Sequence, residues 1–242
     1  MNKQDLKDAL SHRPMMARLA YRLYYLALAV FAKLLRFRYL GRCYIPRDVT
    51  LLGVRDISTG TNCGIGSGSW LNVNHRGRGM GITIGNNCII GRDNFFSSGN
   101  SIRVGDYCLT TRYCAFIGSS HVYKSPLQPY ASTGTSNSNR IYIGANCFFG
   151  YGARVIGNVR IGHGSVIGAG AVVTNDIPPF SLVVGNPAAV IKRYNFDSES
   201  WTRDLALSIG EFENEDLYLM HLKKQHLVQP IPALNSRIYD LP

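Results

Sequence analysis

Histidine exchanges protons readily near neutral pH, and three of the six histidines in this 242-residue chain lie in its patterned middle. A histidine held in a loop can act as a general base toward a hydroxyl or an amine. His163 stands between two glycines, where we expect an exposed turn. Ordinary surface positions are expected for the histidines outside the pattern, His12, His221 and His226. His75 and His121, which lie at interruptions of the pattern, are therefore the candidates for chemistry.

The pattern that must position these histidines is a six-residue repeat. A large apolar residue is followed by glycine at Ile84-Gly85, Ile90-Gly91, Val104-Gly105, Ile143-Gly144, Phe149-Gly150, Ile161-Gly162 and Ile167-Gly168. Only the two steps through Ile156-Gly157 are irregular, by one residue each. A short fixed period predicts an all-β solenoid, a β-helix with three short strands per coil. The apolar residue points inward, and the glycine lets the backbone bend at a crowded corner.

Two segments interrupt the repeat. The first, residues 72–81, is rich in glycine and arginine and contains His75. The second, residues 122–140, directly follows His121 and has no periodicity. A long insertion in a tight solenoid usually serves function. Both segments leave after the third strand of a coil, so the two histidines are expected to share one edge of the prism.

The end of the repeat is its most specific part. It runs Gly168-Ala-Gly-Ala-Val-Val-Thr-Asn-Asp-Ile-Pro-Pro179, then Gly185-Asn-Pro-Ala-Ala-Val-Ile-Lys-Arg193. These residues resemble the hexapeptide-repeat acyltransferases, in particular the maltose and galactoside O-acetyltransferases and their capsule and lipopolysaccharide relatives. The resemblance covers about residues 50 to 194. It implies a left-handed parallel β-helix, acetyl-CoA as cosubstrate and acyl transfer, and we expect a homotrimer because the active groove needs a second wall.

The resemblance assigns a role to His121. In the family, the catalytic histidine lies where the third strand ends and the extended loop begins, and Ser119-Ser-His121 occupies that place without a gap back to Val104-Gly105. His121 is therefore expected to be the general base that takes the proton of the acceptor hydroxyl. The group that orients its second ring nitrogen stays open.

The resemblance also implies a groove for acetyl-CoA along the last coils, between adjacent subunits. The pantetheine arm is expected near Gly150, Tyr151 and Ala169, the nucleotide end near Thr174 and Asn175, and the phosphates near Lys192 and Arg193. A second family arginine is replaced here by Ala189. No metal is expected, because a zinc site of the carbonic anhydrase type needs three convergent histidines and the spacing does not match.

The acceptor is less defined. Gly91 stands where maltose-type enzymes have an acceptor-binding asparagine, so Asp93 and Asn94 are candidates to replace it, and His75, Arg76 and Arg78 form a second candidate contact. We expect O-acetylation of a bacterial surface polysaccharide, capsule or O-antigen, or of its precursor. N-acetylation of an amino sugar and a non-catalytic β-helix scaffold stay open as alternatives.

Charge is concentrated at the N-terminus. The chain has a net charge of +11, and residues 1–42 carry nine Lys or Arg against two Asp. A helix is expected over residues 14–40, but its uncharged run from Leu23 to Ala32 is too short to span a membrane, which takes ~20 residues. It could lie on an anionic membrane face or pack in the trimer, and both stay open. Nucleic acid is not expected, because no binding motif accompanies the charge.

The cysteines and the ends of the chain complete the prediction. Four cysteines precede the central residue of a coil by two positions: Cys63, Cys88, Cys108 and Cys147. We expect a ladder of buried free thiols, which favours the cytoplasm. The predicted domains are a basic helical segment at 1–42, the β-helix at 43–194 with its insertion, and a tail at 195–242. The tail is expected to be helical at 201–209 and 216–226, and Pro178-Pro179 is expected to end the strand ladder.

Overall fold

A computed structural model describes residues 43–76 and 80–225, together with Met16, Leu19, Leu23, Ala27 and Val30. The chain divides into two compact units, residues 1–38 and 39–242. Apart from those five positions, which are helical, the predicted helix at 14–40 lies outside the described residues, as do Arg78, His12 and His226. In the part of the chain that is described, no helix has the length and apolar character needed to cross a membrane.

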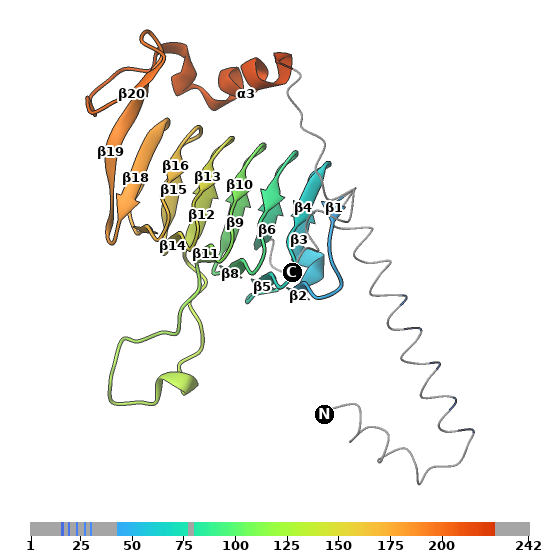
Figure 1. The fold of residues 1–242 in the computed structure, drawn as a ribbon. Coiled ribbons are helices and arrows are strands. Elements are labelled where there is room, and N and C mark those ends of the chain that lie inside the picture. The colour runs from blue at the N-terminus through green and yellow to red at the C-terminus, as the bar shows by residue number, and fades with distance from the viewer. Residues whose placement is uncertain are drawn as a thin grey trace. The chain divides into compact units, whose positions relative to one another are not determined.

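Residues 43–202 wind through three sheets in turn (Figure 1). Sheet 1 contains β1 (Cys43–Tyr44), β4 (Cys63–Ile65), β7 (Ile89–Ile90), β10 (Leu109–Thr110), β13 (Phe148–Phe149), β16 (Val166–Ile167), β18 (Ser181–Gly185), β19 (Ala188–Asn195) and β20 (Ser200–Thr202). Sheet 2 contains β2 (Thr50–Leu52), β5 (Trp70–Val73), β8 (Phe95–Ser98), β11 (Ala115–Ile117), β14 (Arg154–Ile156) and β17 (Val172–Val173). Sheet 3 contains β3 (Ile57–Thr59), β6 (Gly81–Ile84), β9 (Ser101–Val104), β12 (Arg140–Ile143) and β15 (Val159–Ile161).

Strands of successive coils pair in parallel in all three sheets, which gives the predicted solenoid three edges. We call the corners from sheet 2 to sheet 3 the histidine edge, because His75 and His121 follow β5 and β11 there. The corners from sheet 3 to sheet 1 form the cap edge, and those from sheet 1 to sheet 2 form the aromatic edge. Between the strands and before α3, the described residues also form the short single-turn helices η1 (Val54–Asp56), η2 (Tyr130–Ser132) and η3 (Gly210–Glu213).

The inward side chains stack along the solenoid. In sheet 2, the rings of Phe96 and Phe116 are stacked with centroids 4.5 Å apart. The next inward residue is Val155, which is 0% exposed, whereas Ile156 is 36% exposed. The predicted irregularity at Ile156 is therefore wrong. Both residues are apolar, and the glycine after Ile156 made Ile156 look like the inward residue. The inward position is Val155, so the repeat continues in steps of six.

The predicted thiol ladder is present and lies on the cap edge. Each thiol donates to the carbonyl of a corner glycine in the following coil, for example from Cys63 to Gly85 (2.9 Å), and from Cys88 to Gly105 (3.1 Å). The described cysteines are all free. Burial raises the pKa of the Cys108 thiol well above its ordinary value. These thiols therefore act as small inward side chains with one satisfied hydrogen bond.

The end of the solenoid differs from the prediction. The parallel ladder continues past Pro178-Pro179, because β18 pairs with β16, and then the chain reverses into β19 and β20. Residues 201–209 are strand and turn rather than helix, since β20 adds to sheet 1. The later helix is α3 (Glu215–Lys224), and the Asn214 side chain caps its N-terminus by accepting two backbone N–H bonds.

Candidate functional site

The insertion leaves the histidine edge between β11 and β12 and projects away from the sheets (Figure 1). Its two ends pair as a short antiparallel neck. Val122 donates its backbone N–H to the Gly134 carbonyl (3.1 Å), and Ser136 donates to Ser120 (2.8 Å). His121 lies in this neck opposite Thr135. The backbone of His121 is therefore fixed on both sides, although it stands in a long loop.

The two candidate histidines meet at the same neck. His75 Nε2 lies 3.3 Å from the hydroxyl of Thr135, the residue that bridges to His121. The side chain of His121 is exposed, and within residues 43–76 and 80–225 its imidazole has no hydrogen-bond partner. An exposed imidazole on a fixed backbone can accept a proton from a bound hydroxyl, and catalytic hydrogen bonds often form only with substrate present.

Two residues that sequence reasoning missed hold this edge together. One is Thr135. The other is Asn74, whose amide donates to the Ser97 hydroxyl and to the Ser98 carbonyl, both at 3.0 Å. Asn74 thereby ties the start of the first loop to the neighbouring coil. The only sequence signal was the concentration of polar residues just past two strand ends. The guanidinium of Arg76 donates to the Val73 carbonyl (3.4 Å) at the same place.

Asp93 and Asn94 lie at the opposite ends of the sheet 2 strands, on the aromatic edge. Asn94 is 1% exposed, and its amide donates to the carbonyls of Arg92 (3.0 Å) and Thr111 (2.8 Å). Asp93 accepts a 2.8 Å bond from Arg112. The chain therefore does not bring these two residues to His121 within one subunit, and the amide nitrogen of Asn94 is occupied by backbone carbonyls.

The residues expected to hold acetyl-CoA divide between two edges. Gly150, Tyr151 and Ala169 lie on the aromatic edge, where the ring of Tyr151 is 58% exposed and meets Tyr113 edge-on at 5.5 Å. A Cβ on Gly150 would lie 2.6 Å from the Ala169 nitrogen, so only glycine allows these coils to approach. Exposed Thr174 lies at the end of β17, on the histidine edge, and exposed Asn175 follows it.

Lys192 and Arg193 lie side by side on β19 but face different surroundings. Lys192 is half-buried, whereas Arg193 is 7% exposed and donates to the Leu205 carbonyl (3.3 Å). The C-terminal tail therefore buries Arg193 and bonds one nitrogen of its guanidinium. Of the two, only Lys192 is left with a side chain that can reach a phosphate.

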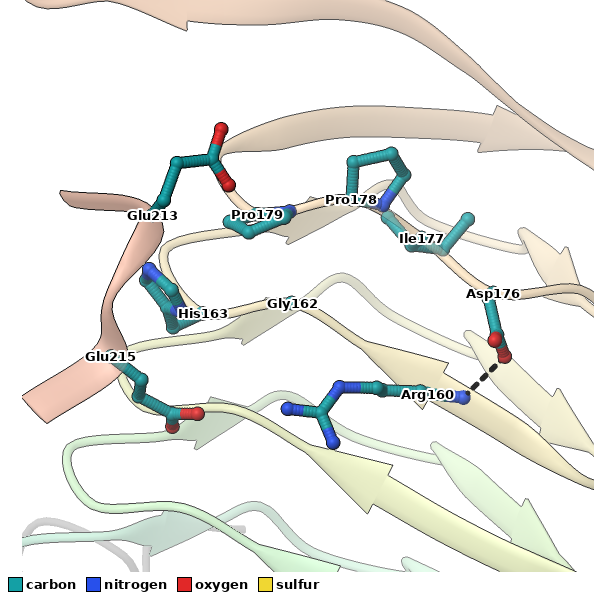
Figure 2. Close-up of a pocket in the computed structure, with 9 residues that line it drawn as sticks. All are labelled: Arg160, Gly162, His163, Asp176, Ile177, Pro178, Pro179, Glu213 and Glu215. Atoms are coloured by element: carbon teal, nitrogen blue, oxygen red, sulfur yellow. Dashed lines mark hydrogen bonds between the residues drawn. The ribbon is translucent and has the colours of Figure 1, made fainter. Parts of the chain in front are cut away.

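The prediction of an exposed turn at His163 is wrong. His163 is 3% exposed, its Nε2 lies 2.7 Å from the Phe212 carbonyl, and its ring packs 5.3 Å from that of Tyr218. The tail covers it, and Glu215 anchors that cover by accepting from the Tyr142 hydroxyl and the Ala145 N–H, both at 2.7 Å. Burial, followed by this bond to Glu215, raises the pKa of Tyr142 to about 12. Beside His163 a cavity of about 440 Å³ opens (Figure 2).

Comparison with known proteins identifies the repeat. Residues 140–175 match the bacterial transferase hexapeptide family, described as six repeats. The chain carries the hexapeptide repeat of bacterial transferases. The chain is 39% identical over 125 residues to a provisionally named acetyltransferase of Staphylococcus aureus (strain Mu50). This match covers 51% of the chain and 61% of the relative. The chain is also 27% identical over 192 residues to one of Mycobacterium tuberculosis (strain H37Rv), which covers 76% and 64% respectively.

These matches confirm the resemblance to hexapeptide-repeat acyltransferases, while the chain spans only part of the curated relatives that it matches. Among solved structures, the chain is similar to AntD, an N-acyltransferase from Bacillus cereus in complex with dTDP and 3-hydroxybutyryl-CoA. The TM-score is 0.55 at 18% identity, with 77% of this chain and 89% of that chain covered. At this identity the likeness shows the fold alone.

Proposed function

We propose that the protein is an acetyl-CoA-dependent O-acetyltransferase that acts on a sugar hydroxyl, with His121 as the general base. The proposal is based on the arrangement at the histidine edge. There the hexapeptide solenoid is interrupted beside an exposed histidine whose backbone is fixed in the neck opposite Thr135. We infer the left-handed winding of the solenoid from the same repeat.

In the proposed step, His121 carries one proton from the acceptor hydroxyl to the CoA thiolate. The imidazole of His121 takes the proton of the acceptor hydroxyl while its oxygen attacks the thioester carbonyl carbon. The tetrahedral oxyanion then collapses, the carbon–sulfur bond breaks, and the imidazolium returns the proton to the CoA thiolate. His75 acts here through the Thr135 hydroxyl, because that contact fixes the strand opposite His121.

The division of the acetyl-CoA residues favours a homotrimer. Tyr151 on the aromatic edge and Thr174 on the histidine edge can line one groove only if two copies face each other, one edge from each. The outward side of sheet 1 supports such a contact, because its ladder is wholly apolar from β7 to β18: Ile89, Leu109, Phe148, Val166 and Leu182. Light scattering should give a trimer, and an active monomer would remove this part of the proposal.

For the acceptor we propose a bacterial surface polysaccharide or its precursor. The insertion presents exposed Tyr123 and Tyr130, and tyrosine rings suit the faces of sugars. The same base could serve an amine, so O- and N-transfer need a direct test. CoA release should be followed with a thiol reagent in the presence of polysaccharides and amino sugars. The acetylated product should then lose its acetyl group in mild alkali, as an ester does. An alkali-stable amide would replace O-transfer by N-transfer, and acceptor-independent CoA release would leave only a scaffold.

We also propose that the N-terminal segment holds the protein at the cytoplasmic face of an anionic membrane. Met16, Leu19, Leu23 and Val30 are helical, exposed and spaced three or four residues apart through Ala27, which places them on one helix face. The segment is also strongly basic. Full-length protein should co-sediment with anionic vesicles, and a form without residues 1–40 should not. Equal sedimentation of both forms would contradict the membrane role.

A further inference from the structure

The outward side of sheet 3 differs from that of sheet 1. Its central ladder runs through Ser58, Thr83, Arg103, Tyr142 and Arg160. Every member is polar or aromatic with a polar group, whereas the matching ladder of sheet 1 is apolar. Sheet 3 is therefore less suited than sheet 1 to burial against another copy, and its arginines are exposed.

One of these arginines, Arg103, lines a cavity together with a second arginine of the same face, Arg140. Arg103 on β9 and Arg140 on β12 are both exposed, and they border a cavity of about 440 Å³ together with Asn100, Ser101 and Tyr142. Arg103 is opposite Tyr142 in the ladder, and Arg140 precedes Tyr142 by two residues. A strand spacing of about 4.8 Å and a rise of about 3.3 Å per residue put the two arginine backbones roughly 8 Å apart. One oxyanion between their side chains can thus meet both guanidinium groups.

In the part of the chain that the structure describes, the two arginines of this cavity have no ion-pair partner, and the nearby carboxylate of Glu215 bonds the Tyr142 hydroxyl instead. The Nε of Arg140 donates to the Asn100 side-chain oxygen (3.3 Å), which orients the guanidinium over the cavity. That bond also leaves the amide nitrogen of Asn100 as a further donor beside the Ser101 hydroxyl. Such a set of donors suits a phosphate or a carboxylate, which arginine binds through paired N–H groups.

The cavity adjoins the histidine edge. Asn100 follows the corner after β8, and its backbone N–H donates to the carbonyl of Asn139 (2.8 Å), near the end of the insertion that follows His121. Arg140 is the next residue in the chain. An acceptor held near His121 can therefore extend directly over Arg140 and onto sheet 3. Further along the sheet, Arg160 stacks 4.2 Å over the Tyr142 ring.

We propose that the cavity lined by Arg103, Arg140, Asn100 and Ser101 binds an oxyanion of the acceptor, so that the enzyme selects an anionic glycan or glycan precursor. The oxyanion is either the diphosphate of a nucleotide- or lipid-linked sugar or the carboxylate of an acidic sugar unit. This inference depends on the proposed function in one respect, namely that the bound molecule is the acceptor of the acetyl group. Binding of the anion itself does not depend on catalysis.

The test measures binding without turnover. Inorganic pyrophosphate and glucuronate are titrated into the full-length protein by calorimetry at low salt, since salt screens such contacts. The double variant Arg103→Gln/Arg140→Gln should raise the Kd of the bound anion ~10-fold or more, because charge-assisted hydrogen bonds are lost. The matched control is Arg154→Gln. Arg154 is an exposed arginine on sheet 2 whose guanidinium donates to the Gly152 carbonyl.

Each outcome decides. Loss of pyrophosphate binding in the double variant, with the control unchanged, supports a diphosphate ligand, and the same loss for glucuronate supports an acidic sugar. Equal affinities of the wild type, the double variant and the control for both anions would overturn the site. Thermal unfolding should show that all variants are folded. If the anion binds but no acceptor is acetylated, the proposed function fails while the site stands.

Discussion

The histidine edge and the cap edge are corners of the same repeat, yet one leaves its histidine exposed and the other buries it. On the cap edge, the corners are filled by the thiol ladder, and His163 is buried under η3 and α3. On the histidine edge, the chain leaves the solenoid, and His121 stands exposed on a neck held by Thr135. Whether a histidine next to a corner is buried or exposed is thus decided by the segment that meets it, and not by the repeat.

The largest effect that tests this comparison is expected at His121. His121→Ala should lower the acetyl-transfer rate by ~10²–10⁴, the usual loss for a general base. Because the side chain is exposed, the urea midpoint of unfolding should not change. His221→Ala, at an exposed histidine of α3, is the matched control and should turn over like the wild type. A folded His121→Ala enzyme with a near-normal rate would remove the assignment.

His163 should show the reverse behaviour. His163→Ala removes a buried ring that packs on Phe180 and Tyr218 and frees the Phe212 carbonyl, so the free energy of unfolding should fall by ~2–4 kcal/mol. The rate per folded molecule should stay unchanged. Urea unfolding and active-site-normalised kinetics measure the two effects. A loss of rate without a loss of stability would show that His163 serves catalysis, as His121 is expected to do.

The thiol ladder should give the cap edge a pH dependence. Because burial raises the pKa of Cys108 in the folded protein, its contribution to stability is full below the unfolded pKa of about 8.5 and is lost as pH rises toward the folded value. The loss is at most ~1.4 kcal/mol per pH unit for each thiol. Cys108→Ser can keep the bond to the Gly144 carbonyl but does not ionise, so its unfolding free energy should fall less steeply above pH 9. Parallel slopes for both proteins would contradict this.

The smallest effect is expected at His75. His75→Ala removes its contact with Thr135, and a neutral hydrogen bond contributes ~1 kcal/mol, so the transfer rate should fall ~5-fold. Thr135→Val removes the same contact from the other side. The double variant should therefore lose no more than either single variant. Additive losses would show that His75 acts on the acceptor directly and not through the neck.

The solenoid was predictable because its information is local. One inward residue in six and a small residue two positions earlier specify strand, corner and core, and they also identify the ladder of Cys63 to Cys147. The shared edge of His75 and His121 followed from counting strands. The register at Val155 was missed because two apolar residues stand together there and only burial separates them.

What escaped prediction depends on contacts between residues distant in sequence. The residues next to His163 in the sequence do not indicate that Phe212 and Tyr218 cover it, because the tail carries no repeat. The burial of Arg193 against the Leu205 carbonyl has the same origin. The amide of Asn94 was expected to face a ligand, but it bonds to corner carbonyls, one of them from the next coil. Polar residue type alone does not distinguish these two uses.

The reversal of the chain after β18 has a consequence for how molecules meet end to end. A stack of parallel coils exposes a row of free backbone groups at its last turn, and such a row is a template for adding further strands from other molecules. Here β19 occupies that row in the antiparallel sense, and the last strand added, β20, is only three residues long. The β18–β20 reversal therefore terminates sheet 1, and it should protect the protein against growth into fibres at this end.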